Sequence, residues 1–180
     1  MYDLHSILIQ LKKEDTPLHV VMVRCVRCFY QWLDPTLWEG SALFELWAQE
    51  LELIYGDLRQ RLSPNAKTDA GSLGDRFGFD TPPELPRLLP SIQTFYSVLI
   101  KLIAWNTLRG ATPEPPLTEL LSGRAFVNRG IRNFCGDDWY IWPLDIWDPA
   151  LETQGEELRA CLEAFDTCPE GSTLSPDSLS

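Results

Sequence analysis

Two cysteines one helical turn apart, Cys25 and Cys28, have the Cys-x-x-Cys spacing of zinc ligands or of a redox pair. A structural zinc site requires four ligands, and no second Cys-x-x-Cys and no His-x-x-x-His motif follows. A redox pair would open a helix after a strand, whereas this pair lies inside an apolar run. The other candidate ligands are scattered: His5, His19, Cys135, Cys161 and Cys168. We interpret the pair as small residues of a packed helix and predict no metal site.

A group of aspartates could in principle bind magnesium or act in acid–base chemistry, and it comprises Asp137, Asp138, Asp145 and Asp148. No basic or nucleophilic residue is placed with them. Asp138 beside aromatic residues and Asp148 before proline are typical of turns and helix N-caps. The chain also has no glycine-rich phosphate loop, no nucleophile elbow and no catalytic-triad order. We therefore predict neither catalytic nor cofactor-binding residues.

An arginine cluster, formed by Arg124, Arg129 and Arg132, is the sharpest local feature of this acidic chain. Arginines in such a group can contact phosphates. They can equally form ion pairs with the neighbouring acidic residues. The sequence leaves both interpretations open.

One stretch, Leu88 to Leu108, is expected to form the helix around which the domain is built, with the helix proper beginning near Pro90. Apolar residues recur around most of its helical wheel. Gln93, Ser97 and Lys101 repeat every four residues and leave one narrow polar stripe. We expect other helices to enclose this helix, and the polar stripe to touch water or a buried polar partner.

Two further expectations follow from that pattern. Tyr96 and Leu99 are predicted to be among the most buried residues of the central helix. Polar residues interrupt the run well before the ~20 apolar residues that a bilayer requires, so we expect no membrane span.

The remaining elements are predicted from caps, prolines and periodicity. Thr16-Pro17 is a helix-start signal, and Thr81-Pro82-Pro83-Glu84 resembles a capping box. The resulting prediction is helix over 17–33, amphipathic helix over 42–62, a surface loop over 63–80, a helical turn over 117–122, an aromatic loop or short hairpin over 126–147, and a last helix from Asp148-Pro149.

Length, composition and net charge limit the possible fold class and the possible binding partners. A chain of 180 residues with 44% apolar residues and seven tryptophans can bury a core, so we predict an all-α irregular bundle over 1–166 with a disordered tail over 167–180. A net charge of −11 disfavours DNA binding by the isolated chain. Five cysteines without a secretory signal favour a cytoplasmic location.

Three segments, 42–57, 89–106 and 129–148, share an order of motifs with a known family. The matching residues are Trp47, Tyr55 and Gly56; then Gln93, Thr94, Phe95, Tyr96, Lys101 and Leu102; then Gly130, Ile131, Asn133, Phe134, Gly136, Asp137, Trp142 and Trp147. In this order they resemble the helical region that precedes the catalytic domain in large N-6 adenine DNA methyltransferases of the fused restriction–modification type.

The resemblance implies an accessory or scaffold region, a split or truncated piece of such an enzyme. The family's cofactor-binding glycine motif and its Asn-Pro-Pro-Tyr/Phe catalytic motif are absent from this chain. S-adenosylmethionine would therefore bind only to a separate domain, the partner would be a methyltransferase catalytic chain, and DNA would be contacted only in the assembled complex. The alternative is a free-standing acidic helical module that binds proteins and has no connection to DNA.

Overall fold

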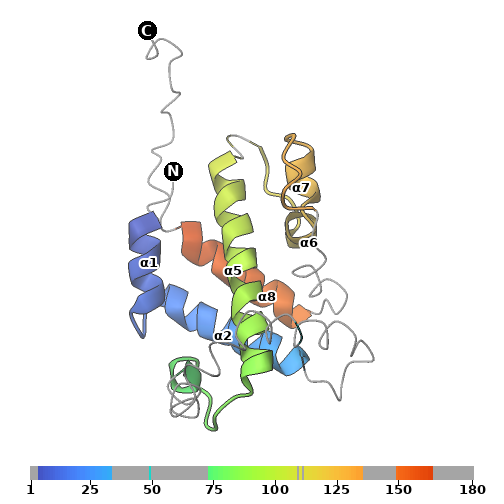
Figure 1. The fold of residues 1–180 in the computed structure, drawn as a ribbon. Coiled ribbons are helices and arrows are strands. Elements are labelled where there is room, and N and C mark those ends of the chain that lie inside the picture. Colours follow the sequence, from blue (N-terminus) through green and yellow to red (C-terminus); the bar gives the residue numbers. More distant parts are fainter. Residues whose placement is uncertain are drawn as a thin grey trace.

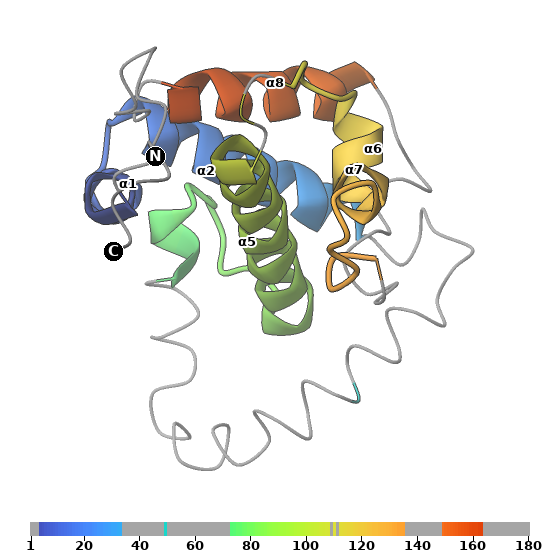
Figure 2. The same cartoon turned by 90° about the horizontal axis from the view of Figure 1, so that it is seen from above.

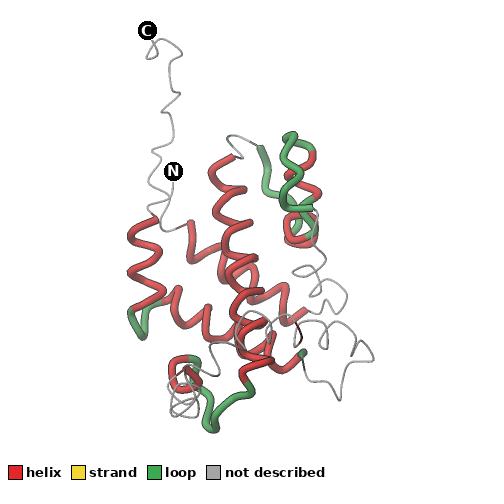
Figure 3. The backbone as a smooth tube through the Cα atoms, viewed as in Figure 1, coloured by secondary structure: helices red, strands yellow, loops and turns green. Residues whose placement is uncertain are grey.

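The computed structural model describes residues 4–33, 49, 73–108, 110, 112–135 and 149–163. Its helices are α1 (Leu4–Lys12), α2 (Pro17–Trp32), α5 (Leu85–Leu108), α6 (Leu117–Leu121), α7 (Arg124–Val127) and α8 (Pro149–Glu163) (Figure 1). These residues contain no strand, so the predicted all-α class is confirmed for this part of the chain (Figure 3). Most of the predicted 42–62 helix, the last part of the aromatic segment and the C-terminal tail lie outside the described residues.

Helix α2 is the element that the other long helices share, because it contacts α1, α5 and α8 (Figures 1 and 2). One side of α2 is buried, including Leu18, Val26 and Phe29. The residues predicted to lie on its polar face, Arg24, Arg27 and Gln31, are exposed. The periodicity of this segment therefore predicted both the helix and its orientation correctly.

The start of α2 confirms the helix-start signal predicted at Thr16-Pro17. Thr16 is the N-cap, its Oγ1 accepts a hydrogen bond from the backbone N–H of His19 at 3.3 Å, and Pro17 occupies the first helical position. Asp15 adopts a left-handed φ of 63°, which turns the chain between α1 and α2. The buried His19 ring donates from Nδ1 to the Leu11 carbonyl at 3.0 Å, so this turn is tied to the end of α1.

Helix α5 begins at Leu85, and Pro90 lies inside it, so the predicted start near Pro90 is wrong. Contacts with α2 explain the earlier start. The Tyr30 hydroxyl accepts from the Glu84 N–H at 3.0 Å, and Arg87 donates to the Tyr30 carbonyl at 2.9 Å. The Arg87 guanidinium also lies 4.2 Å from the centre of the Tyr30 ring. These tertiary contacts hold the first turn of α5 despite the hydrogen bond that Pro90 cannot donate.

The end of the predicted 63–80 loop is packed rather than open at the surface. Residues 73–76 form a helical turn, and Phe77 is buried. Phe79 makes an edge-to-face contact with Tyr30, with 4.8 Å between the ring centres. The prediction was a surface loop, whereas its described end contains a helical turn and two phenylalanines that pack against the helices, Phe79 on Tyr30 of α2.

Helices α6 and α7 form a compact corner against the C-terminal half of α5 (Figure 2). Phe126 is fully buried and lies 5.8 Å from Trp105 and 4.4 Å from Phe134, measured between ring centres. The described part of the predicted aromatic segment therefore docks on the helices, and residues 126–135 contain no strand. Helix α8 begins at Pro149, as predicted, and buries Leu158.

Candidate protein-interaction surface

Helix α5 is buried along only one side. Its buried residues form a continuous arc of the helical wheel that faces the core: Leu88, Pro90, Ser91, Thr94, Phe95, Val98, Leu99, Lys101, Leu102 and Trp105. Figure 1 shows the helix crossing α2 and α8, with α6 and α7 beside its C-terminal half. The expected enclosure by helices on all sides is therefore not found among the described residues.

The opposite side of α5 is apolar and reaches solvent. Tyr96 is 41% exposed and Ile100 is 55% exposed, and both belong to one stripe with the half-buried Ile92 and Ile103. These four residues, called the α5 stripe below, follow a spacing of four, four and three, which places them along one side of a helix. The prediction that Leu99 is buried is confirmed, since it is 4% exposed, and the prediction for Tyr96 is wrong.

The polar residues of α5 explain why the helix has this orientation. Lys101 is only 5% exposed, and its ammonium group donates to the Leu121 carbonyl at 2.5 Å. Burial lowers the pKa of Lys101, and the neighbouring Cys135 thiol acts in the opposite direction. Gln93 and Ser97 are half-buried. The expected buried polar partner therefore exists for Lys101, and it is the Leu121 carbonyl at the end of α6.

By length and composition alone, α5 could also cross a bilayer, with a mean hydropathy of 1.3 over its most apolar 18-residue window. Within the fold, 56% of that window is buried. Buried Lys101, Ser91 and Thr94 lie on the side that packs on other helices. We interpret α5 as the core helix of a domain with one uncovered face.

The arginine cluster does not act as one unit in this fold. Arg129 donates to the Leu108 carbonyl at 2.8 Å and to the Thr112 hydroxyl, and its guanidinium lies 5.6 Å from the Trp105 ring centre. It thus ties the end of α5 to the connector that follows. Arg124 and Arg132 are exposed and have no side-chain hydrogen bond or ion pair within the described ranges. The aspartates predicted as ion-pair partners lie outside those ranges.

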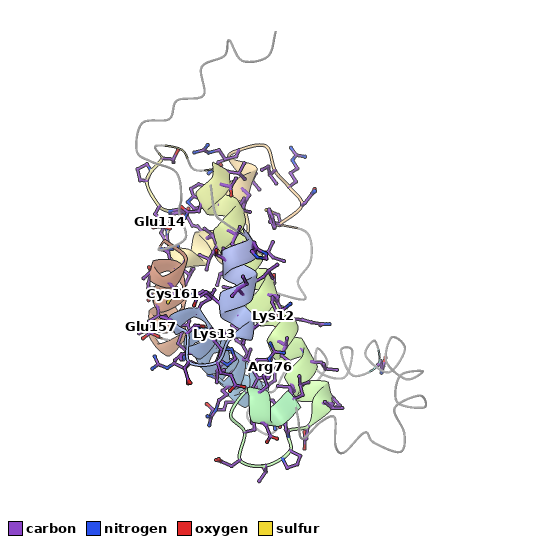
Figure 4. The ribbon with its side chains drawn as sticks, turned by 90° about the vertical axis from the view of Figure 1, so that its left-hand side faces the viewer. Lys12, Lys13, Arg76, Glu114, Glu157 and Cys161 are labelled. Atoms are coloured by element: carbon purple, nitrogen blue, oxygen red, sulfur yellow. The ribbon has the colours of Figure 1, made fainter. Side chains whose placement is uncertain are left out.

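The Cys-x-x-Cys pair lies inside α2, as the sequence suggested. Burial is the main cause that raises the pKa of Cys25 to about 12, so its side chain stays a neutral thiol. Burial also raises the pKa of Cys161 on α8, one turn beyond Glu157 (Figure 4). Among the residues that the structure describes, no group of three or more His, Cys, Asp or Glu side chains is placed to hold a metal ion.

The exposure of the α5 stripe is the feature that sequence reasoning missed. An apolar pattern around most of a helix shows how much of its surface favours burial. It does not show how much of that surface other parts of the chain bury. Comparisons with protein-family models, curated proteins and solved structures gave no match for this chain. The resemblance to the methyltransferase helical region therefore stays a prediction.

Proposed function

We propose that this chain is a non-catalytic accessory domain that binds the catalytic chain of an N-6 adenine DNA methyltransferase through the α5 stripe. The exposed apolar side of α5 is the observation that supports a binding role. Tyr96 and Ile100 are exposed on a 24-residue helix whose other side is buried in the core. Interfaces are enriched in such aromatic anchors, and covering an aliphatic or aromatic side chain contributes about 1.5–3 kcal/mol.

The resemblance of three segments to the region preceding the catalytic domain is what selects this partner. One of those segments, 89–106, contains all four residues of the α5 stripe. In this proposal the partner supplies the S-adenosylmethionine site and the methyl transfer, and DNA is contacted only by the assembled complex. The net charge of −11 fits that division, since an acidic chain repels DNA at long range. We place the complex in the cytoplasm.

The test uses two exposed apolar residues with the same exposure on different helices. Ile100 on α5 is 55% exposed and Leu8 on α1 is 54% exposed. Binding to a purified methyltransferase chain, encoded beside this chain and carrying the glycine-rich and Asn-Pro-Pro motifs, is measured by calorimetry. Ile100→Asp should weaken binding by tenfold or more, because a desolvated carboxylate opposes an apolar interface. Leu8→Asp should leave the affinity within about twofold, as expected for a residue outside the interface.

The outcomes separate this proposal from its alternatives. Equal affinities for both variants would exclude the α5 stripe as the interface. Self-association of the chain that Ile100→Asp abolishes, without binding to the methyltransferase, would identify a second copy as the occupant. Binding to an unrelated protein through the same residues would favour the free-standing interaction module. Heat from S-adenosylmethionine binding to the isolated chain would contradict the non-catalytic assignment.

A further inference from the structure

A solvent-open groove of about 450 Å³ lies between α2 and α8, away from the α5 stripe. Its lining from α2 includes Val23, Arg24, Arg27, Gln31 and Trp32, and Gln154 comes from α8. The volume is within the range of small-molecule sites, which combine apolar walls with a few polar groups. The groove therefore has the size and the mixed lining of a ligand site.

Two arginines give this groove a local positive charge in a chain whose net charge is −11. Arg24 and Arg27 are three residues apart on α2, and both line the groove. The Arg27 guanidinium lies 5.8 Å from the centre of the Phe79 ring, which restricts its position. Arg24 pairs with Glu157 at 3.0 Å. Because Arg24 is exposed, this pair is weak and can open for an anion.

The other groups in the groove suit the rest of a ligand. Trp32 is half-buried, and its ring makes an edge-to-face contact with Phe29 at 6.1 Å between centres. Val23 also lines the groove. Gln154 lines the groove, and its Oε1 is buried and accepts no hydrogen bond from the residues that the structure describes. A buried amide oxygen without a partner is uncommon, because leaving it unpaired costs about 1–3 kcal/mol.

We propose that this groove binds a small phosphate monoester that carries a planar ring, with the size and chemistry of a nucleoside monophosphate. The phosphate is held by Arg24 and Arg27, whose planar N–H donors match phosphate oxygens. The ring lies against Trp32, and the amide of Gln154 pairs with its polar edge. Glu157 competes with the phosphate for Arg24. The inference concerns a site that the proposed accessory role does not use.

Calorimetric titration of the full chain with adenosine monophosphate tests the site, and inorganic phosphate and adenosine are titrated separately. We expect saturable binding with a dissociation constant of about 1 mM or below. Arg27→Gln should weaken it at least tenfold, since a phosphate contact is lost. Glu157→Gln should strengthen it, because Arg24 is released. Arg76→Gln, an exposed arginine on the 73–76 turn (Figure 4), is the matched control and should change nothing.

Thiol alkylation gives an independent readout that does not depend on a mutation. Cys28 also lines the groove, whereas Cys135 is an exposed thiol outside it. Adenosine monophosphate should slow alkylation of Cys28 and leave that of Cys135 unchanged. The proposal is overturned if adenosine monophosphate does not bind, if Arg27→Gln binds it as well as Arg76→Gln does, or if inorganic phosphate alone binds as tightly.

Discussion

Gly123 and Gly130 share a backbone conformation but not an environment. Their φ angles are +77° and +78°, in the left-handed region that favours glycine. A Cβ on Gly123 would lie 2.3 Å from the Phe134 carbonyl oxygen and 2.7 Å from the Cys135 sulfur. A Cβ on Gly130 would meet no atom within 4 Å. Gly123 thus allows the 134–135 backbone to close onto the corner between α6 and α7.

The first prediction compares alanine at these two positions. Gly130→Ala should lower the free energy of unfolding by about 1–2 kcal/mol, the cost of a left-handed backbone for an L-residue. Gly123→Ala should lower it further, because the Cβ also displaces the Phe134 backbone. Urea unfolding of both variants measures the difference. Equal losses would mean that the close approach of Phe134 to Gly123 does not occur.

The buried Lys101 should make stability depend on pH. Its pKa in the folded chain is lowered from 10.5, mainly by burial. Between the two pKa values the unfolded chain binds a proton that the folded chain has released, so stability rises with pH across this window and levels off above 10.5. Lys101→Met removes this titration.

The measurement is the free energy of unfolding of the natural chain minus that of Lys101→Met, from neutral pH to above 10.5. We expect the difference to increase with pH. Subtraction removes the contributions of Cys25 and Cys161, whose raised pKa values lower stability as pH rises above their ordinary value of 9.0. A difference that stays constant with pH would contradict a buried, desolvated ammonium group.

At the scale of elements, Leu99 and Ile100 are neighbours in α5 but differ in burial, because they lie on different sides of the helix. Leu99 is 4% exposed, and Ile100 is 55% exposed. Leu99→Ala should lower the free energy of unfolding by about 2–5 kcal/mol through lost transfer energy and a cavity. Ile100→Ala should change it by less than about 0.5 kcal/mol, as is usual at exposed positions. Thermal and urea melts check both values, and a comparable loss from Ile100→Ala would show that the α5 stripe is covered.

At the scale of the whole molecule, residues far apart in sequence converge on one core. Ile7 of α1, Phe29 of α2 and Leu158 of α8 belong to the same buried cluster. Arg159 pairs with Glu114 at 3.0 Å and with Glu156 at 2.9 Å, which fixes the connector before α6 to α8. These contacts join α1, α2 and α8 around one buried core, and the single domain over 1–166 stays a prediction.

Sequence alone determined the elements whose signals are local. The Thr16 cap with Pro17, the exposed face of α2, the helical turn near Leu117 and the start of α8 at Pro149 were all predicted from caps and periodicity. The all-α class followed from the same helical periodicity. These features depend on residues within a few positions of each other, so a single sequence contains the information that decides them.

Tertiary structure decided the features that depend on distant partners. The start of α5 at Leu85 depends on Tyr30, more than fifty residues earlier in the chain. Lys101 is buried and donates to the Leu121 carbonyl, whereas Tyr96 and Ile100, elsewhere around α5, are exposed. Arg129, which the sequence groups with Arg124 and Arg132, instead donates to the Leu108 carbonyl at the end of α5 and to the Thr112 hydroxyl. Periodicity identifies the apolar faces of a helix, but only the packed fold determines which face is covered, because the covering groups come from elsewhere in the chain.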